Sequence, residues 1–350
     1  MKKKMKTKFG IFGINCSSGL SLTTHNKRWK ADWKKIVKLV KYADDIGIDF
    51  ILPLSQLKDW GGKTRPNKNS LETFTFSSIL GALTKKIYFF STVHMPHIHP
   101  IYAAKATATI DGFLGNRHGV NLVCGYNPKI IQMFDANKTE RFDYNQAKEW
   151  VQIYKKLLDK KYSSINFKGD FFSIKNAQCF PKSSIQPHPK IVSAAFSPNG
   201  RDFAKKNCNI LFTMFKDLHI TKKNNFDLKK QALKHKNKIK IYTALHVICR
   251  NTHAEAKEFK EKLGTKYADK EAVKNYLGAT SNKLLNKLQR DNFSNIATSC
   301  GAKVVYGNYK NVQEELWEIG KIYDGISMIF LDYENELINF NENVYKKIKN

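Results

Sequence analysis

The sequence predicts a single (β/α)8 barrel, and three observations support this fold class. Short apolar runs alternate with amphipathic segments along all 350 residues. Eight of these runs are apolar on both faces, as expected for strands of a parallel sheet that helices cover. No GxGxxG motif follows the first run, so a dinucleotide-binding Rossmann unit has no support. Eight βα repeats fit a closed barrel better than a doubly wound sheet.

The elements follow one another in a regular order. The predicted strands begin near residues 8, 49, 87, 118, 190, 210, 240 and 325. Helical spacing of apolar residues occupies residues 30–46, 71–86, 100–113, 141–160, 197–207, about 252–290 and 311–323, and a further helix ends the chain. Residues 167–189 contain a small β excursion and a Pro-containing loop. We interpret residues 1–350 as one domain with insertions at about 165–190 and 255–310.

The charge balance is strongly basic. Sixty Lys and Arg against 30 Asp and Glu give a net charge of +30 and a pI near 9.7. Such an excess occurs in nucleic-acid-binding proteins. Here the lysines are spread over the whole chain, which is not a localised footprint, so we expect no nucleic-acid partner. A non-catalytic basic protein that binds RNA or acidic lipid remains the alternative from a different functional class.

Membrane and metal sites have no sequence support. No stretch of 18 uncharged apolar residues appears, and the apolar run after the basic N-terminus is too short for a secretory signal, so we expect a cytoplasmic protein with no membrane partner. The six cysteines are scattered singly, without CxxC or Cys/His ligand spacing. We therefore expect buried free thiols and no metal.

In a barrel of this type the functional residues follow the C-terminal ends of the strands. Those positions are polar and aromatic, with no converging Asp/Glu pair for glycosidase chemistry and no His/carboxylate cluster for a metal. Ser- and Gly-rich strand ends can hold a phosphate through N–H groups and hydroxyls, and Arg141 can pair with its charge. A site without a strong acid, base or metal indicates that a cofactor carries the chemistry.

Several linked motifs carry a family resemblance. GNRHGVNLVCGYN (115–127) resembles the GGR-x-G-x-N-x-V-x-G-W segment of luciferase-like flavin monooxygenases, and the match continues through residues 103–112 and 132–157. WGGKT (60–64), LETFTF (71–76) and the segment from residue 167 to SPNGRDFA (197–204) are most similar to the pyrimidine oxygenase branch, which opens the uracil ring. Sulfone and alkanesulfonate monooxygenases are more distant relatives. The resemblance runs from about residue 8 to 215 and weakly to the end.

The resemblance implies a function and a set of partners. It implies a monooxygenase that uses reduced FMN (FMNH2) and O2 to oxidise a small organic substrate, with a pyrimidine ring as one candidate. A separate NAD(P)H:flavin reductase would supply the flavin, and a homo-oligomer is expected. A sulfone or alkanesulfonate monooxygenase and a deazaflavin-dependent oxidoreductase on the same barrel are the alternative enzymes.

The resemblance also assigns roles to individual positions. The residues expected to bind the cofactor are Ser55, Gln56, Asn121, Arg141, Phe142 and Ser197, and Ser197 matches a serine that contacts the flavin phosphate. Thr92 and Asn121 are the expected catalytic residues because they match the pair that lines the dioxygen pocket. Independently of the resemblance, Trp60, His94 and Tyr126 lie at strand ends or in the loops that follow them and are expected to line the substrate pocket; Trp60 also fits a loop-packing role.

Two departures from the pyrimidine branch concern the substrate. Lys129 falls where that branch has a glutamate, after a turn that is one residue shorter here, so the charge is reversed. His94, His97 and His99 have no clear counterpart in that branch. Their spacing beside Pro96 and Pro100 suits neither one strand face nor a helix, which favours a pocket-lining loop over a metal site.

Overall fold

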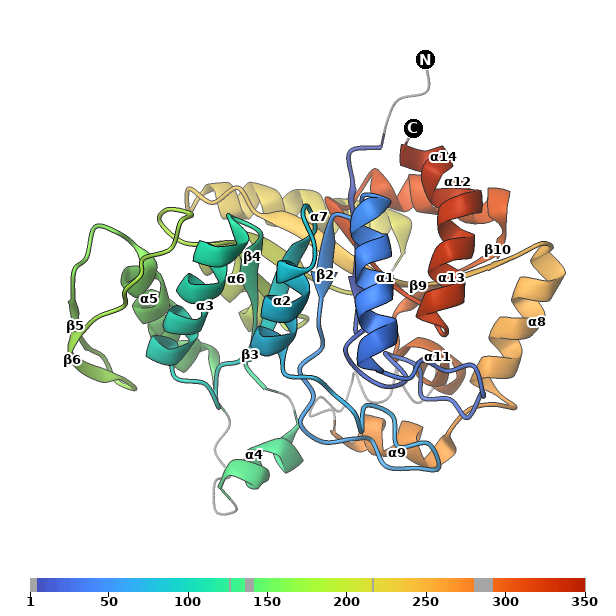
Figure 1. The fold of residues 1–350 in the computed structure, drawn as a ribbon, viewed down its shortest axis with the longest axis horizontal. Coiled ribbons are helices and arrows are strands. Elements are labelled where there is room, and N and C mark those ends of the chain that lie inside the picture. Colours follow the sequence, from blue (N-terminus) through green and yellow to red (C-terminus); the bar gives the residue numbers. More distant parts are fainter. Residues whose placement is uncertain (1–4, 126, 136–141, 216, 280–291, 350) are drawn as a thin grey trace.

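The computed structural model describes residues 5–125, 127–135, 142–215, 217–279 and 292–349, and its centre is a closed parallel barrel (Figure 1). The barrel strands are β1 (Lys8–Phe12), β2 (Phe50–Leu52), β3 (Tyr88–His94), β4 (His118–Val123), β7 (Ile191–Ala194), β8 (Ile210–Phe212), β9 (Lys240–Arg250) and β11 (Gly325–Ile329). Each pairs in parallel with the next strand in this order, and β11 pairs with β1. The prediction of a (β/α)8 barrel is confirmed, with all eight strands where the apolar runs placed them.

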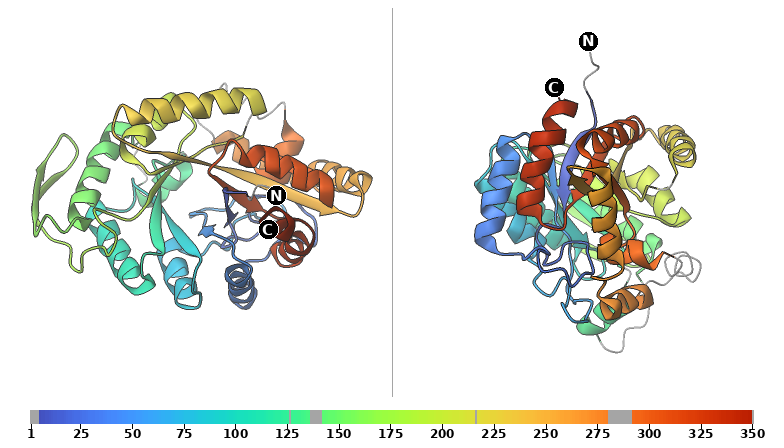
Figure 2. Two further views of the ribbon diagram at one scale, coloured as in Figure 1. Left: turned by 90° about the horizontal axis from the view of Figure 1, so that it is seen from above. Right: turned by 90° about the vertical axis from the view of Figure 1, so that its right-hand side faces the viewer.

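Helices surround this barrel, as the view from above shows (Figure 2). They are α1 (Trp33–Asp45), α2 (Thr73–Ala82), α3 (Pro100–Leu114), α4 (Pro128–Phe134), α5 (Tyr144–Leu158), α6 (Pro198–Asn207), α7 (Leu218–Leu233), α8 (His253–Gly264), α9 (Lys270–Ala279), α11 (Phe293–Ser299), α12 (Tyr309–Gly320), α13 (Tyr333–Phe340), the π-helical turn η1 (Asn341–Tyr345) and α14 (Lys346–Lys349). Side-chain caps fix where several of them begin. Asp143, for example, accepts hydrogen bonds from two N–H groups of the first turn of α5. None of the described helices is long and apolar enough to cross a bilayer.

Two features lie outside the barrel ring. The predicted β excursion is an antiparallel hairpin of β5 (Ile165–Lys168) and β6 (Ser173–Ala177). A ninth parallel strand, β10 (Lys303–Asn308), pairs with the second half of β9 beyond the point where β8 ends. The sequence analysis missed β10, because only three apolar residues mark it within a segment interpreted as an insertion. The division into one domain with two insertions stays a prediction.

Alternation along the strands separates two apolar layers. Side chains such as Phe50, Phe90, Phe212 and Tyr242 fill the barrel interior, while their sequence neighbours pack outward against the helices. Gly10 and Gly325 make this filling possible, because a Cβ at these positions would collide with the rings of Phe50 and Tyr242 respectively. On β3 and β4 the inward-facing side chains become polar toward the C-terminal ends, where Thr92 and His94 follow Phe90 and Asn121 lies beside Thr92.

Candidate active site

Asn121 and Thr92, the pair that the resemblance assigns to the dioxygen pocket, are adjacent in the register of β3 and β4. Thr92 Oγ1 donates to the carbonyl oxygen of Pro53 at 2.6 Å, and Asn121 Nδ2 donates to Thr92 Oγ1 at 3.1 Å. This chain fixes the orientation of the amide. Asn121 Oδ1 is buried and has no hydrogen-bond partner among the described residues. A buried acceptor without a partner costs free energy, which indicates a place for a ligand donor.

His94 lies on the same inner face of β3 as Thr92, nearer the C-terminal end of the strand. Its Nε2 is 3.0 Å from the carbonyl oxygen of Ser55. Because a carbonyl only accepts, Nε2 carries the proton and Nδ1 carries a lone pair. Nδ1 is buried and unpaired within the described part of the chain, and burial lowers the pKa of the ring, which stays neutral. Gln56, next to Ser55, is buried and donates to the carbonyl oxygen of Lys58.

The other two histidines of the 94–100 motif have separate structural contacts. His99 caps α3, its Nδ1 accepting from the N–H of Ile101 at 3.3 Å. His97 stacks on Phe134 of α4, with ring centroids 4.0 Å apart. Across the described ranges, no group of three or more His, Cys, Asp or Glu side chains is placed to hold a metal ion.

Trp60 is buried in the loop after β2. Its Nε1 donates to Asn67 at 2.9 Å, and its ring meets Tyr276 of α9 edge to face. In the same loop, Thr64 donates to the carboxylate of Asp269 through both its N–H and its hydroxyl. These contacts support the loop-packing role of Trp60, and its substrate-pocket role stays a prediction.

The N-terminus of α6 is the predicted phosphate position. Ser197 is exposed and caps this helix, its Oγ accepting from the N–H of Gly200 at 3.1 Å. The hydroxyl proton remains able to donate to an anion beside the helix N-terminus. Phe142 is partly buried against the core between barrel and helices. Arg141 and Tyr126 lie outside the described residues, and Lys129 is exposed in the first turn of α4.

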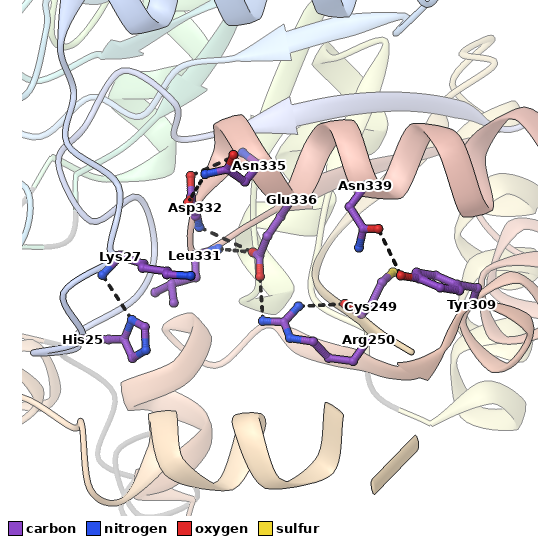
Figure 3. Close-up of polar contacts among 10 residues, drawn as sticks. All are labelled: His25, Lys27, Cys249, Arg250, Tyr309, Leu331, Asp332, Asn335, Glu336 and Asn339. Carbon is purple, nitrogen blue, oxygen red and sulfur yellow. Dashed lines mark hydrogen bonds and ion pairs between the residues drawn. The ribbon is translucent and has the colours of Figure 1, made fainter. Parts of the chain in front are cut away.

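The ends of β9 and β11 carry a polar cluster that the sequence analysis missed (Figure 3). Glu336 of α13 points toward Arg250, with Arg250 Nη2 3.0 Å from its Oε1. Its Oε2 accepts from the N–H groups of Leu331 and Asp332. Burial raises the pKa of Glu336, and the Arg250 guanidinium opposes this effect. Phe259 covers the guanidinium at 4.0 Å, so this cluster fastens the loop after β11 to the end of β9.

A cavity of about 520 Å3 lies away from the barrel mouth, between α5 and the β5–β6 hairpin. It contains none of the predicted site residues. Glu149, which lines it, accepts hydrogen bonds from the N–H groups of Asp170, Phe171 and Phe172. This carboxylate is committed to holding the hairpin turn, so the cavity has the character of a structural crevice.

Comparisons with known proteins agree with this geometry. Residues 7–297 match the family described as luciferase-like monooxygenase. A protein of Allorhizobium ampelinum named pyrimidine monooxygenase RutA is 33% identical over 202 residues, which are 56% of this chain and 53% of that protein, so this alignment spans about half of the relative. A protein of the same name from Escherichia coli O1:K1 is 27% identical over 360 residues, covering 98% of this chain and 92% of that protein.

Solved structures show the same fold at low identity. The long-chain alkane monooxygenase LadA has a TM-score of 0.84 at 20% identity, covering 99% of this chain and 92% of LadA. Riboflavin lyase RcaE, solved with modified FMN and riboflavin, has a TM-score of 0.86 at 16% identity, covering 99% of this chain and 91% of RcaE. At this level of identity both structures support the barrel fold and do not identify the substrate.

Proposed function

The chain belongs to the luciferase-like monooxygenase family and is a flavin-dependent monooxygenase, and we propose that it uses reduced FMN and dioxygen to oxidise a pyrimidine or a similar small molecule. The observation that carries the proposal is the oriented amide of Asn121, whose buried Oδ1 has no partner within the described ranges. It lies in the barrel half where functional residues of this fold gather. The resemblance noted in the sequence is confirmed at the level of the family.

The residues present fit FMN. Asn121 Oδ1 and His94 Nδ1 are buried acceptors able to receive N–H groups of a ring system. Ser197 and the N–H groups of α6 would hold the phosphate, with Arg141 as its charge partner and Phe142 beside it. Ser55 and Gln56 would contact the flavin from the end of β2. When bound, reduced FMN supplies two electrons and the position at which dioxygen reacts.

The chain's own part in the reaction is to position the reactants and exclude water. Thr92 holds Asn121 in one orientation through the hydrogen bond that its own hydroxyl receives. The apolar interior below this pair, with Phe90 and Phe212, keeps water from the dioxygen pocket. His94 is held neutral by burial and adds no charge to the pocket. Tyr126 and Trp60 are proposed to complete the substrate wall.

The pyrimidine assignment is supported by relatives that cover most of the chain and are named pyrimidine monooxygenases. Lys129 is the specific departure, because a cation stands at an exposed position where that branch has an acid. We propose a substrate with the polar ring chemistry of a pyrimidine, taken up together with O2. The reduced flavin would come from a separate NAD(P)H:flavin reductase. A homo-oligomeric state and a cytoplasmic location stay predictions.

The test is to supply FMN, NADH and a flavin reductase in turn, with uracil, a sulfone and an alkanesulfonate as substrates. We expect weak FMN binding, oxygen consumption only when reduced flavin is delivered, and product from uracil. Oxidation of NADH by the isolated protein would contradict the two-component assignment. Steeply salt-dependent binding of RNA without FMN binding would favour the basic-binding alternative instead.

A further inference from the structure

His246 faces the barrel interior from the wall opposite β3. On β9, Tyr242 and Ala244 belong to the inner cluster while Leu245 and Val247 pack outward, so alternation turns His246 inward. Its register partner on β11 is Ile329, which also faces inward. In the strand order of the closed barrel, β9 stands four strands from β3 in either direction. His246 therefore lies on the inner face of β9, opposite the wall that carries His94 and Asn121. It marks the edge of the interior, because Ile248 and Val304 beyond it pack with α8 in a separate apolar cluster.

The tautomer of His246 follows from its one hydrogen bond to the protein. Nδ1 lies 2.9 Å from the carbonyl oxygen of Thr298, at the end of α11. That carbonyl also accepts from the hydroxyl of Ser21, so its position is fixed. Because a carbonyl has no proton to give, Nδ1 of His246 is the donor and Nε2 carries a lone pair. Nε2 is buried and has no hydrogen-bond partner in the described part of the chain.

The imidazole of His246 is neutral, so Nε2 carries no proton that it could donate. Burial, with a smaller contribution from the nearby Arg250 charge, lowers the pKa of His246 to about 4, although the hydrogen bond to Thr298 opposes this shift. A neutral imidazole whose Nδ1–H is committed to a backbone carbonyl can only accept at Nε2. Leaving such an acceptor buried and unpaired costs about 1–3 kcal/mol, which a ligand donor would recover.

The interior therefore presents three oriented acceptors from two sides. They are Asn121 Oδ1, His94 Nδ1 and His246 Nε2, each fixed because another atom of the same group donates to the protein. None of the three can turn to donate without breaking that bond. Asn121 Oδ1 and His94 Nδ1 are the acceptors that the flavin would use, so His246 Nε2 is left, on the opposite wall, for an N–H group of the second ligand.

We propose that His246 contacts the substrate and that its Nε2 accepts a hydrogen bond from a ring N–H of a nitrogen heterocycle. This inference rests on the proposed function and adds the group that selects the heterocycle. A ring N–H flanked by carbonyl groups is a strong neutral donor, which suits a neutral buried acceptor. A methyl group on that nitrogen removes the donor and adds volume at the contact.

The experiment compares two variants and three ligands on the full-length, FMN-loaded protein. His246→Phe removes the acceptor, whereas His246→Gln places an amide oxygen near the position of Nε2. Binding of uracil, 1-methyluracil and 3-methyluracil is measured from the change in the visible spectrum of bound FMN, and kcat and KM are measured with a flavin reductase. We expect His246→Phe to weaken uracil binding roughly 10-fold, His246→Gln to stay near wild type, and FMN affinity to be unchanged. One of the two methyluracils should bind weakly to the wild type and be insensitive to both substitutions.

Three outcomes would overturn the inference. The first is uracil affinity in a folded His246→Phe variant that equals that of the wild type. The second is turnover of a sulfone or alkanesulfonate, instead of uracil, that is the same in wild type and His246→Phe; this leaves the monooxygenase function intact and refutes only the heterocycle. The third is an imidazole 15N spectrum in which Nδ1 of His246, and not Nε2, is unprotonated, a result that needs neither FMN nor substrate. A protein that binds no FMN would refute the proposed function separately.

Discussion

Two polar clusters lie at the C-terminal ends of barrel strands, and they differ in how completely their groups are paired. At β3 and β4, Thr92 and Asn121 form a short hydrogen-bonded chain that leaves one buried acceptor unpaired within the described ranges. At β9 and β11, the charges of Arg250 and Glu336 are paired with each other and with backbone groups. A buried polar residue is therefore not in itself a sign of a binding site. The β3–β4 cluster is distinguished by an acceptor, unpaired among the described residues, that lies inside the barrel at the C-terminal ends of its strands, where functional residues of this fold gather.

The largest effect is expected from breaking the paired cluster. Glu336→Leu leaves the Arg250 guanidinium without its carboxylate and frees the N–H of Leu331. This pair is partly buried, and the lost hydrogen bonds to a charged group should lower the free energy of unfolding by roughly 3 kcal/mol in urea titrations. The control is Glu334→Ala on the same helix, whose carboxylate pairs with exposed Lys35 and Lys38 and should contribute less than about 1 kcal/mol. Equal stability of the two variants would contradict the assigned structural role.

Lowering the pH should destabilise the folded protein, because burial keeps His246 on β9 in its neutral form. The folded protein lowers the pKa of His246 to about 4, while an unfolded histidine titrates near its ordinary value of 6.5. The unfolded state therefore binds a proton first, and stability is lost as the pH falls from about 6.5 to about 4. Once His246 is protonated in both the folded and the unfolded state, the free energy of unfolding has fallen by about 3 kcal/mol because of this residue. His246→Gln, which cannot titrate, should flatten the pH dependence of unfolding in this range, and an unchanged slope would refute the assignment.

The unpaired cluster is tested by Asn121→Leu, which keeps the volume roughly similar and removes donor and acceptor. Thr92 still donates to the carbonyl of Pro53, so folding should be little affected. Oxygenation should fall on the order of 100-fold, as when one oriented polar group is removed from a reaction site, while FMN still binds. Product yield and peroxide release measure this outcome. Ser91→Ala, on the outward face of β3, removes a buried hydrogen-bonding hydroxyl and should leave the yield unchanged. Full product yield from Asn121→Leu would remove it from the reaction.

The β3–β4 cluster could be predicted from the sequence, whereas the β9–β11 cluster could not. The barrel strands were predictable because residues such as Ile51 and Phe89 make runs that are apolar on both faces. The neighbours Thr92 and Asn121 followed from the order of the strands. Arg250 and Glu336 are separated by 86 residues and meet only through the register of β9 and the position of α13, which no local pattern encodes.

The histidines show most clearly which properties of a residue cannot be predicted from the sequence. The motif at residues 94–99 drew attention as a group, yet its members bind a carbonyl, stack on Phe134 and cap a helix. His246 stands alone in an apolar strand and gave no signal in the sequence. Its importance depends on which nitrogen is committed to Thr298, a fact of tertiary geometry.

The smallest effect is expected at two helix caps that look alike. Ser197 and Thr252 each accept a hydrogen bond from the N–H three residues later, at 3.1 and 3.2 Å. Either change to alanine should cost about 1 kcal/mol of stability.

Only Ser197→Ala should also weaken FMN binding, by about 10-fold in a fluorescence titration, because one donor to the phosphate is lost. The reason for the difference lies in the first turn of each helix. At α8, Glu255 reaches back to the N–H of Thr252, so a carboxylate already occupies the position that an anion would take. At α6 no acidic residue stands in the first turn, and the helix N-terminus remains available to a phosphate. Equal FMN affinity in Ser197→Ala and Thr252→Ala would place the phosphate elsewhere on the barrel rim.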